Sequence, residues 1–139
     1  MKNINLHPEV VVGIFLKNKK GEIALFKSKK WNNFWWTVGG HVEYGELLIK
    51  AAQRETREEA GIDVKELQLI YSGELINSDV FFRESHFIYF YYLAFIDEEN
   101  LKIDNKEILE YKWFSIEEIY SMENVHNHLL EVIDRINKL

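Results

Sequence analysis

The chain has 139 residues, of which 47% are hydrophobic and 14% aromatic, and it contains no cysteine. A chain of this length and composition is expected to fold as a single domain over residues 1–139 and is too apolar to be disordered. The lack of cysteine excludes a disulfide framework, a thiolate metal site and a cysteine nucleophile, and it fits a cytoplasmic protein. The net charge of −6 argues against binding to a nucleic acid polymer.

The first part of the chain predicts a hairpin followed by a basic loop. Val10–Lys17 is rich in β-branched residues and predicts a strand. Residues 18–21, Asn-Lys-Lys-Gly, predict a turn, and Glu22–Lys27 predicts the returning strand. A polar, basic loop is expected over Lys27–Asn33, and a short aromatic strand over Phe34–Val38.

The second half predicts three strands and two helices. Strands are expected over Leu67–Asn77, Ser85–Ile96 and, more briefly, Tyr111–Phe114. The apolar run within the second of these is far too short to span a membrane, so no membrane association is expected. Ser115 and Glu118 form a capping box that begins a short helix ending at Ser121. A final amphipathic helix is predicted over residues 125–138, with an apolar stripe that packs on the core.

The segment from Gly40 to Ile62 carries the most informative pattern. It predicts a helix over Leu47–Ala60, which Gly61 ends because glycine adopts positive φ at little cost. One face, with Leu48, Ala51 and Ala52, is expected to dock on the sheet. Three glutamates stand at i, i+3 and i+4 on another face, where like charges repel unless a divalent cation binds them: Glu55, Glu58 and Glu59.

This segment resembles the Nudix box, the signature of hydrolases that cleave nucleoside diphosphates linked to another group. All the glycine, acidic and basic positions of that pattern are filled at the family's spacing: Gly40, Glu46, Arg54, Glu55, Glu58, Glu59 and Gly61. Thr56 is a mild departure, because the family usually has a larger aliphatic residue there. A solvated acidic helix face is the alternative, but it does not explain the glycines in register. The resemblance implies an α/β fold, the Nudix-type α/β/α sandwich with a mixed β-sheet.

The resemblance also implies a metal-dependent site. A cofactor Mg²⁺ or Mn²⁺ would be held by Glu58, Glu59 and Glu55, with a carbonyl oxygen from Gly40. Glu55 alternatively acts as the base that deprotonates the attacking water. The implied supporting residues are Arg54, which orients a neighbouring glutamate, together with Glu46, which fixes the adjoining loop, and Gly61.

Several residues outside the box are candidates for the same chemistry. Glu107 resembles a glutamate that completes the metal site or acts as base in related triphosphate-cleaving enzymes, and Glu110 is its rival. His126 resembles a late catalytic histidine of the GDP-mannose-hydrolysing branch, although that branch departs from the intact box seen here. A surface role is the simpler interpretation of His126, His41 and His86.

Substrate-binding residues are expected just before the box. Lys27 and Lys29, followed by Lys30, precede an aromatic run and would contact phosphate, or else form a solvated loop. Trp31 is the better candidate for stacking on a base, whereas Trp36 is expected in the core. Gly39 and Gly40 would let the backbone pass close to the helix.

The resemblance is strongest to small nucleoside triphosphate diphosphatases. The chain lacks the proline of ADP-ribose hydrolases and the tyrosine of diadenosine-polyphosphate hydrolases, and has Asp79 and Val80 in that region. The expected reaction therefore converts a nucleoside triphosphate to a monophosphate and pyrophosphate. The alternatives are hydrolysis of a nucleotide sugar and a non-catalytic, nucleotide-sensing module. A nucleotide is the expected partner, and the resemblance also allows a homodimer.

Overall fold

The computed structural model describes residues 6–139, and within that range seven strands form one mixed sheet. The strands are β1 (Glu9–Lys17), β2 (Ile23–Ser28), β3 (Trp35–Trp36), β4 (Val38–His41), β5 (Gln68–Ile76), β6 (His86–Phe95) and β7 (Ile108–Phe114). The helical elements are a 3-10 turn, η1 (Lys29–Trp31), and the helices α1 (Leu48–Ala60), α2 (Ile116–Ser121) and α3 (Asn127–Asn137).

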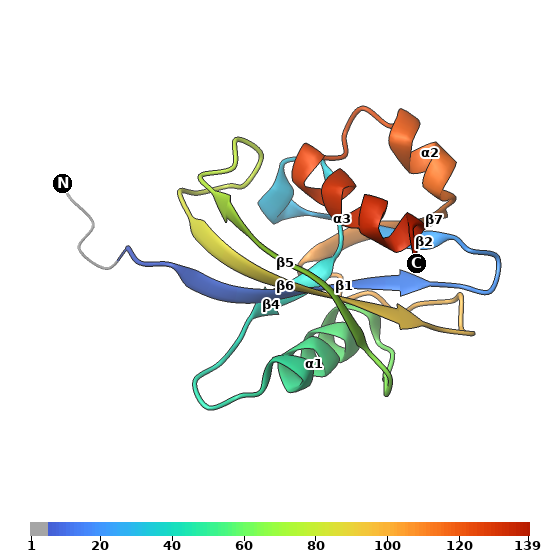
Figure 1. Ribbon diagram of the computed structural model, residues 1–139, viewed down its shortest axis with the longest axis horizontal. Helices are drawn as coiled ribbons and strands as arrows, with labels where there is room; N and C mark the ends of the chain where they lie inside the picture. The colour runs from blue at the N-terminus through green and yellow to red at the C-terminus, as the bar shows by residue number, and fades with distance from the viewer. Residues whose placement is uncertain (1–5) are drawn as a thin grey trace.

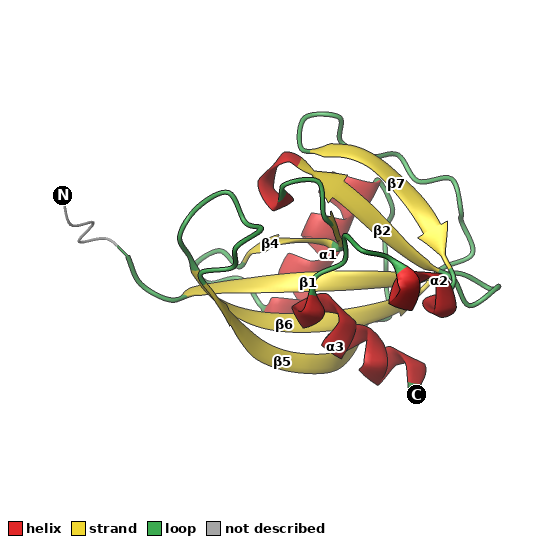
Figure 2. Ribbon diagram, turned by 90° about the horizontal axis from the view of Figure 1, so that it is seen from above, coloured by secondary structure: helices red, strands yellow, loops and turns green. Residues whose placement is uncertain are grey.

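β1 lies at the centre of the sheet, whose main strand order is β3-β2-β1-β6-β5. β1 runs parallel to β6 and antiparallel to β2 and β4, while β7 pairs with β2. α1 covers one face of the sheet, and α2 and α3 cover the other (Figures 1 and 2). This arrangement is the predicted α/β/α sandwich with a mixed sheet.

Two apolar cores fill the spaces between the sheet and the helices. β1 is buried on both faces, as its nearly continuous apolar sequence requires. Val11 and Phe15 pack with the core beneath α2 and α3, whereas Val12 and Ile14 pack with the core beneath α1. The predicted stripe of α3 is buried in the first core, with exposed fractions of 0% to 1%: Leu129, Val132, Ile133 and Ile136.

Some predicted boundaries were wrong because sheet pairing extends the strands. β7 begins at Ile108 rather than Tyr111, because Ile108 pairs with Ser28 across an irregularity in β2. The basic segment predicted as a loop instead contains the end of β2 and the turn η1, which the Ser28 side chain caps by accepting from the Lys30 amide. The predicted short aromatic strand is divided into β3, which pairs with β2, and β4, which pairs with β1.

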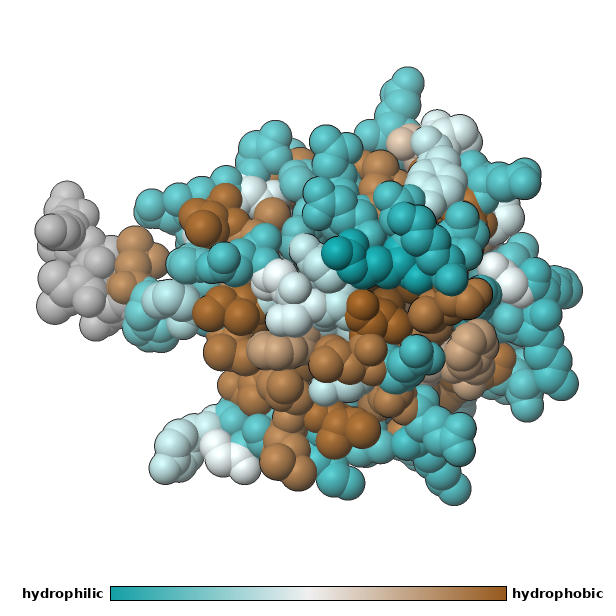
Figure 3. Space-filling view, in the orientation of Figure 1, coloured by the Kyte–Doolittle hydropathy of each residue, from teal (hydrophilic) through white to brown (hydrophobic). Residues whose placement is uncertain are grey.

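β5 forms an edge of the sheet and carries much of the apolar surface on one side of the molecule. Figure 3 shows apolar residues gathered over and around β5. Leu69 and Ile76 on this strand are 51% and 57% exposed. None of the helices within residues 6–139 is both long and apolar enough to cross a membrane.

Candidate active site

α1 presents the box glutamates from a well-anchored helix. Gly61 ends the helix in the left-handed conformation, with φ of 66°, and donates its N–H to the Arg57 carbonyl. Ala51 and Ala52 are fully buried against the sheet, as predicted. Thr56, the one departure from the family pattern, is also fully buried, and its hydroxyl donates to the Ala52 carbonyl at 2.7 Å. The threonine therefore fits the core without leaving a polar group unpaired.

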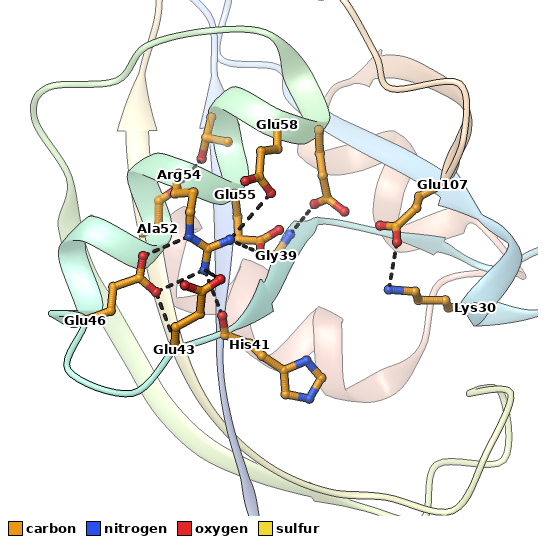
Figure 4. A network of polar contacts seen from close by, with 12 residues as sticks. Lys30, Gly39, His41, Glu43, Glu46, Ala52, Arg54, Glu55, Glu58 and Glu107 are labelled. Carbon is orange, nitrogen blue, oxygen red and sulfur yellow. Dashed lines mark hydrogen bonds and ion pairs between the residues drawn. The ribbon is translucent and has the colours of Figure 1, made fainter.

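Arg54 connects the helix to the loop that precedes it (Figure 4). It donates two hydrogen bonds of 2.8 and 3.0 Å to the carboxylate of Glu46, from Nε and Nη2. Nη1 donates to Glu55 at 2.8 Å and lies 3.5 Å from Glu58, while Nη2 also donates to the His41 carbonyl. The guanidinium is therefore hydrogen-bonded directly to Glu55, and its role in positioning that carboxylate for the reaction stays a prediction.

Glu46 holds the loop in place through its carboxylate. Its Oε1 atom accepts from the Glu43 backbone N–H at 3.0 Å. The hydrogen bonds from Arg54 and from this amide hold the pKa of Glu46 at about 2. Glu46 is thus a negatively charged partner for Arg54 and for the Glu43 amide, and its supporting role in the reaction stays a prediction.

Glu59 is the most deeply buried of the box glutamates, at 7% exposure. Burial raises its pKa to about 8, against the opposing effect of the Gly39 N–H, which donates to Oε1 at 2.8 Å. Burial also raises the pKa of Glu55, partly offset by Arg54. The charges of Glu55 and Glu107 add to the effect on Glu59, so the site concentrates negative charge where little water can screen it.

Gly40 allows β4 to pass directly beside the Glu55 carboxylate. A Cβ atom at position 40 would lie 2.5 Å from the carboxyl carbon of Glu55, closer than real Cβ contacts allow. A Cβ atom at position 39 would instead collide with the Val12 carbonyl oxygen of β1. Gly40 therefore permits the predicted close approach to the helix, whereas Gly39 permits the close approach of β4 to β1.

Glu107 reaches the same region from the far end of the chain. It follows a turn in which its N–H bonds the Asp104 carbonyl, and its carboxylate lies 3.3 Å from Lys30 Nζ. A pocket enclosing about 340 Å³ of empty space, part of it open to solvent, is lined by Glu59, Glu107, Lys30 and Gly39 among other residues. Glu110, the rival candidate, instead pairs with Lys27 at 3.8 Å. It lines neither this pocket nor the adjoining aromatic cleft described below.

The oxygen atoms of the glutamates and of the Gly40 carbonyl are the kind of ligand that a hard divalent cation binds. Its ligands would be carboxylate and carbonyl oxygens, which Mg²⁺ and Mn²⁺ prefer. As the side chains lie, no three acidic or histidine residues among 6–139 converge as a ready-made metal-binding group. Glu55 and Glu58 turn toward Arg54, and Glu59 turns toward Gly39. Burial is the main cause of the raised pKa values of Glu55 and Glu59, and a bound cation would lower both values by favouring the ionised carboxylates.

An aromatic cleft adjoins the carboxylate pocket and encloses about 430 Å³ of empty space, part of it open to solvent. Trp31 and Trp36 stack face to face in its wall, with ring centroids 3.7 Å apart and planes 7° apart. The remaining aromatic lining comes from four residues: His41, Phe81, Phe87 and Tyr89. The cleft and the carboxylate pocket share five residues, so they form one continuous depression: Lys30, Trp31, Trp36, Thr37 and Gly39.

The basic and aromatic residues predicted to bind substrate divide differently from expectation. Trp31 lines the cleft, and Trp36 lies in the core, as expected, but also borders the cleft. Lys27 and Lys29 line neither cavity: Lys27 stands over the Trp35 ring and pairs with Glu110. Lys30, which lies in η1 and whose side chain is about half exposed, lines both cavities. The sequence signal for Lys30 as a cavity-lining residue was its position next to Trp31.

The candidate histidines lie in local contacts away from the box glutamates. His126 caps α3 by accepting from the His128 amide through Nδ1, and its Nε2 lies 3.5 Å from Asp79. His41 bonds Glu9 at 2.6 Å, and His86 bonds Glu74 at 2.9 Å. These contacts give each histidine a structural partner, and His41 also lines the cleft.

Comparison with known proteins agrees with this fold. The NUDIX domain family model matches residues 7–136. The chain is 31% identical over 104 residues to the mouse asymmetrical bis(5'-nucleosyl)-tetraphosphatase, covering 74% of this chain and 70% of that protein. It is also 31% identical to the NAD-capped RNA hydrolase NudC of Erwinia tasmaniensis over 78% of this chain, but spans only 40% of that longer protein.

Solved structures show the same fold at lower identity. A MutT protein from Methanosarcina mazei aligns with a TM-score of 0.82 at 22% identity, over 98% of this chain and 97% of that one. A C. elegans Ap4A hydrolase aligns with a TM-score of 0.68 at 20% identity, over 92% and 96% of the two chains. The chain therefore belongs to the NUDIX domain family and is a Nudix phosphoanhydride hydrolase.

Proposed function

We propose that this protein hydrolyses a nucleoside triphosphate to a nucleoside monophosphate and pyrophosphate with the help of Mg²⁺ or Mn²⁺. The observation that carries the proposal is the continuity of the two cavities, which share Lys30, Trp31 and Gly39. Glu59 and Glu107 line only the first cavity, and Phe81, Phe87 and Tyr89 line only the second. Lys30 and the two tryptophans, Trp31 and Trp36, border both. A molecule that joins a polyphosphate to a flat heterocycle matches both halves at once.

The carboxylates provide the metal-binding half of the mechanism. Glu55, Glu58, Glu59 and Glu107, with the Gly40 carbonyl, would hold the divalent cation. When bound, the cation supplies charge neutralisation at the phosphate oxygens. Lys30 contributes a further positive charge at the junction of the two cavities, where it can contact the phosphate chain.

The chain itself supplies the proton acceptor. Water attacks an internal phosphorus, the bond to the bridging oxygen breaks, and pyrophosphate leaves as the nucleoside monophosphate forms. The proton of the attacking water passes to a carboxylate, with Glu55 and Glu107 as the candidates. Arg54 holds Glu55 in place during this step through the 2.8 Å hydrogen bond from Nη1.

A product analysis tests this proposal. Purified protein with Mg²⁺ is incubated with a panel of nucleoside triphosphates, nucleotide sugars and ADP-ribose, and products are separated by anion-exchange chromatography. The proposal expects pyrophosphate and nucleoside monophosphate from at least one triphosphate. If the triphosphates that are cleaved release orthophosphate and a nucleoside diphosphate instead, the proposal is contradicted.

A dinucleoside tetraphosphate is the second candidate substrate, favoured by the name of the mouse relative. Such a substrate also presents a polyphosphate and a base to the two cavities. Including diadenosine tetraphosphate in the same panel separates the candidates by their relative kcat/KM. A nucleotide sugar is the third candidate, and a sensing module without activity is disfavoured because all the box glutamates are present.

A further inference from the structure

The loop of residues 77–85, which joins β5 to β6 and which we name the cleft loop, forms part of the wall of the aromatic cleft (Figure 1). Its Phe81 side chain lines the cleft, with the ring centroid 4.5 Å from that of Trp31 and 5.0 Å from that of Phe87. Both of these neighbouring rings line the cleft as well. The shape of the cleft therefore depends on where this loop lies.

Hydrogen bonds fix the cleft loop at its base and near its tip. At the base, the Asn77 N–H donates to the Ser85 carbonyl at 2.6 Å, and the Asn77 side-chain oxygen accepts from the Ser85 N–H at 3.0 Å. Near the tip, the Phe82 N–H donates to the Lys30 carbonyl at 2.9 Å. These bonds close the loop and connect it to η1, and a side chain supplies the connection to the sheet.

Arg83 connects the cleft loop to β1 through two hydrogen bonds to one carboxylate. Nη1 donates to Oε2 of Glu9 at 3.0 Å, and Nη2 donates to Oε1 at 2.8 Å. The Glu9 side chain is only 16% exposed, and His41 Nε2 lies 2.6 Å from its Oε1. Hydrogen bonding from Arg83 is the main reason that the pKa of Glu9 is held at about 2, so the carboxylate is charged at neutral pH. A bidentate pair of this kind is directional and stronger than an ordinary surface ion pair.

The same guanidinium lies over aromatic rings of the cleft wall. Its central carbon is 5.4 Å from the Phe81 centroid and 5.8 Å from the Phe87 centroid. A cation is attracted to the negative face of such rings, so Arg83 holds Phe81 by its ring as well as by the loop backbone. Arg83 itself lines neither cavity, so it acts on a ligand through Phe81 rather than by contact.

We propose that Arg83 is a positioning residue, which through Glu9 holds Phe81 in the wall of the aromatic cleft and so sets the affinity for the flat, heterocyclic end of the substrate. A wall that is ordered before the ligand arrives does not lose further conformational freedom on binding. The inference rests on the proposed function, because the phosphates in the carboxylate pocket place the base in the adjoining cleft. The effect falls on binding rather than on turnover, since the box glutamates project from α1 and not from this loop.

Kinetics of Arg83→Gln and Glu9→Gln test the inference, because each variant removes one partner of the pair and keeps a side chain of similar length. Against the preferred triphosphate, KM should rise on the order of fivefold in each while kcat stays within about twofold. The double variant should be no worse than the weaker single variant, because both changes remove the same interaction. Arg83→Lys keeps the charge without the fork and should recover only part of the affinity. Inhibition by inorganic tripolyphosphate, which has no base, should be unchanged throughout.

Arg135→Gln is the matched control. Arg135 is also an arginine stacked on an aromatic ring, with its guanidinium carbon 4.1 Å from the Tyr71 centroid, but it lies on α3 and lines neither cavity. This variant should keep the wild-type KM. Thermal denaturation of every variant checks that no result reflects loss of the fold.

Amide hydrogen exchange, followed by NMR, tests the positioning without any catalysis. Glu9→Gln leaves the sequence of the cleft loop intact, so exchange of the Phe82 amide reports how firmly the loop is held. That exchange should be on the order of fivefold faster than in the wild type. The Trp35 amide, which donates to the Asn124 carbonyl at 2.9 Å outside this loop, should keep its wild-type rate.

Three results would overturn the inference: a wild-type KM in Arg83→Gln or Glu9→Gln, an equal weakening of tripolyphosphate inhibition, and an unchanged exchange rate of the Phe82 amide. If the wild-type protein releases no pyrophosphate from any triphosphate, the proposed function has failed separately. The exchange measurement still applies, and calorimetric titration with AMP, GMP, CMP and UMP then replaces the kinetics. Binding on the order of fivefold weaker in Arg83→Gln would support the inference. Equal affinity, or no binding to the wild type, would overturn it.

Discussion

Arg54 determines the geometry of the site more than any other single residue. It bonds Glu46 through two nitrogens while reaching Glu55 and the His41 carbonyl. A lysine at this position would keep the charge but could not make this set of directed hydrogen bonds. We therefore expect Arg54→Lys to lower kcat by about 10- to 100-fold, as loss of a positioning residue does. Steady-state kinetics beside a Mg²⁺ titration would measure the effect, and wild-type turnover would contradict it.

Substitution of Glu58 or Glu59 by glutamine tests the metal-binding proposal. Glutamine keeps the size of each side chain, and in Glu59→Gln the new amide would retain an oxygen to accept the Gly39 N–H. The fold should therefore survive, while kcat with Mg²⁺ should fall more than about a hundredfold, beyond what loss of a supporting residue costs. Kinetics and thermal denaturation of both variants measure the two effects. Near-normal activity in either purified variant would contradict the assignment.

Identification of the general base requires comparison of three variants. Glu55→Gln and Glu107→Gln should each lower kcat far more than His126→Gln, on the order of 10²-fold or more for the base itself. The structure gives His126 a capping role, with its Nδ1 accepting from the His128 amide. A pH–rate profile of each variant identifies the base, because its loss removes the acidic limb. If only His126→Gln abolishes turnover with metal binding unchanged, the nucleotide-sugar proposal becomes the stronger one.

At the scale of elements, docking of α3 on the sheet should depend on pH through His128. Burial lowers the pKa of His128 from 6.5 to about 4, with a smaller effect from His126. Between these pH values the unfolded chain binds a proton that the folded chain does not, so the free energy of unfolding falls as the pH falls. Above pH 6.5 neither state is protonated at this residue, and below about 4 both are.

The loss over this window should be about 3 kcal/mol, at about 1.4 kcal/mol per pKa unit. Urea denaturation of the wild type and His128→Gln across the window measures it. The variant lacks the titrating group, so the difference in stability between the two proteins should change with pH below 6.5. A difference that stays constant across the window would show that His128 does not titrate as described.

The boundaries of helices and strands were predictable from the sequence only where a local signal sets them. The end of α1 was predictable because Gly61 is a local signal, and its φ of 66° agrees. The start of β7 was not, because Ile108 joins the strand only through pairing with Ser28 on β2. Local propensity carries no information about such a distant partner.

At the scale of the whole molecule, binding of a cation should stabilise the fold. The chain has a net charge of −6, and three box glutamates project from α1, where burial raises the pKa values of Glu55 and Glu59. Mg²⁺ at about 100 times its Kd should raise the free energy of unfolding by about 2.7 kcal/mol. Denaturation with Mg²⁺, against NaCl of equal ionic strength, measures the specific part. Glu59→Gln should lose most of that increment, and an equal effect of NaCl would contradict the prediction.

The sequence by itself determined the family, the helix that carries the glutamates, and the need for glycine beside it. These features are local. The spacing of the glutamates follows from the geometry of one helix, and the glycines lie in the segments just before and after that helix. The sandwich architecture followed from the resemblance that this pattern carries. The chain order of strands and helices was likewise readable from periodicity.

Only the tertiary structure decided which distant residues meet the box. It brought Glu107 beside Lys30 at 3.3 Å, separated Glu110 by pairing it with Lys27, and placed Trp36 in the cleft wall. Neighbouring lysines in a basic run cannot be told apart in sequence; both Lys29 and Lys30 are exposed, but only Lys30 lines the two cavities and pairs with Glu107. The side chain that faces a site depends on strand pairing and turn geometry, which depend on contacts between segments far apart in the chain.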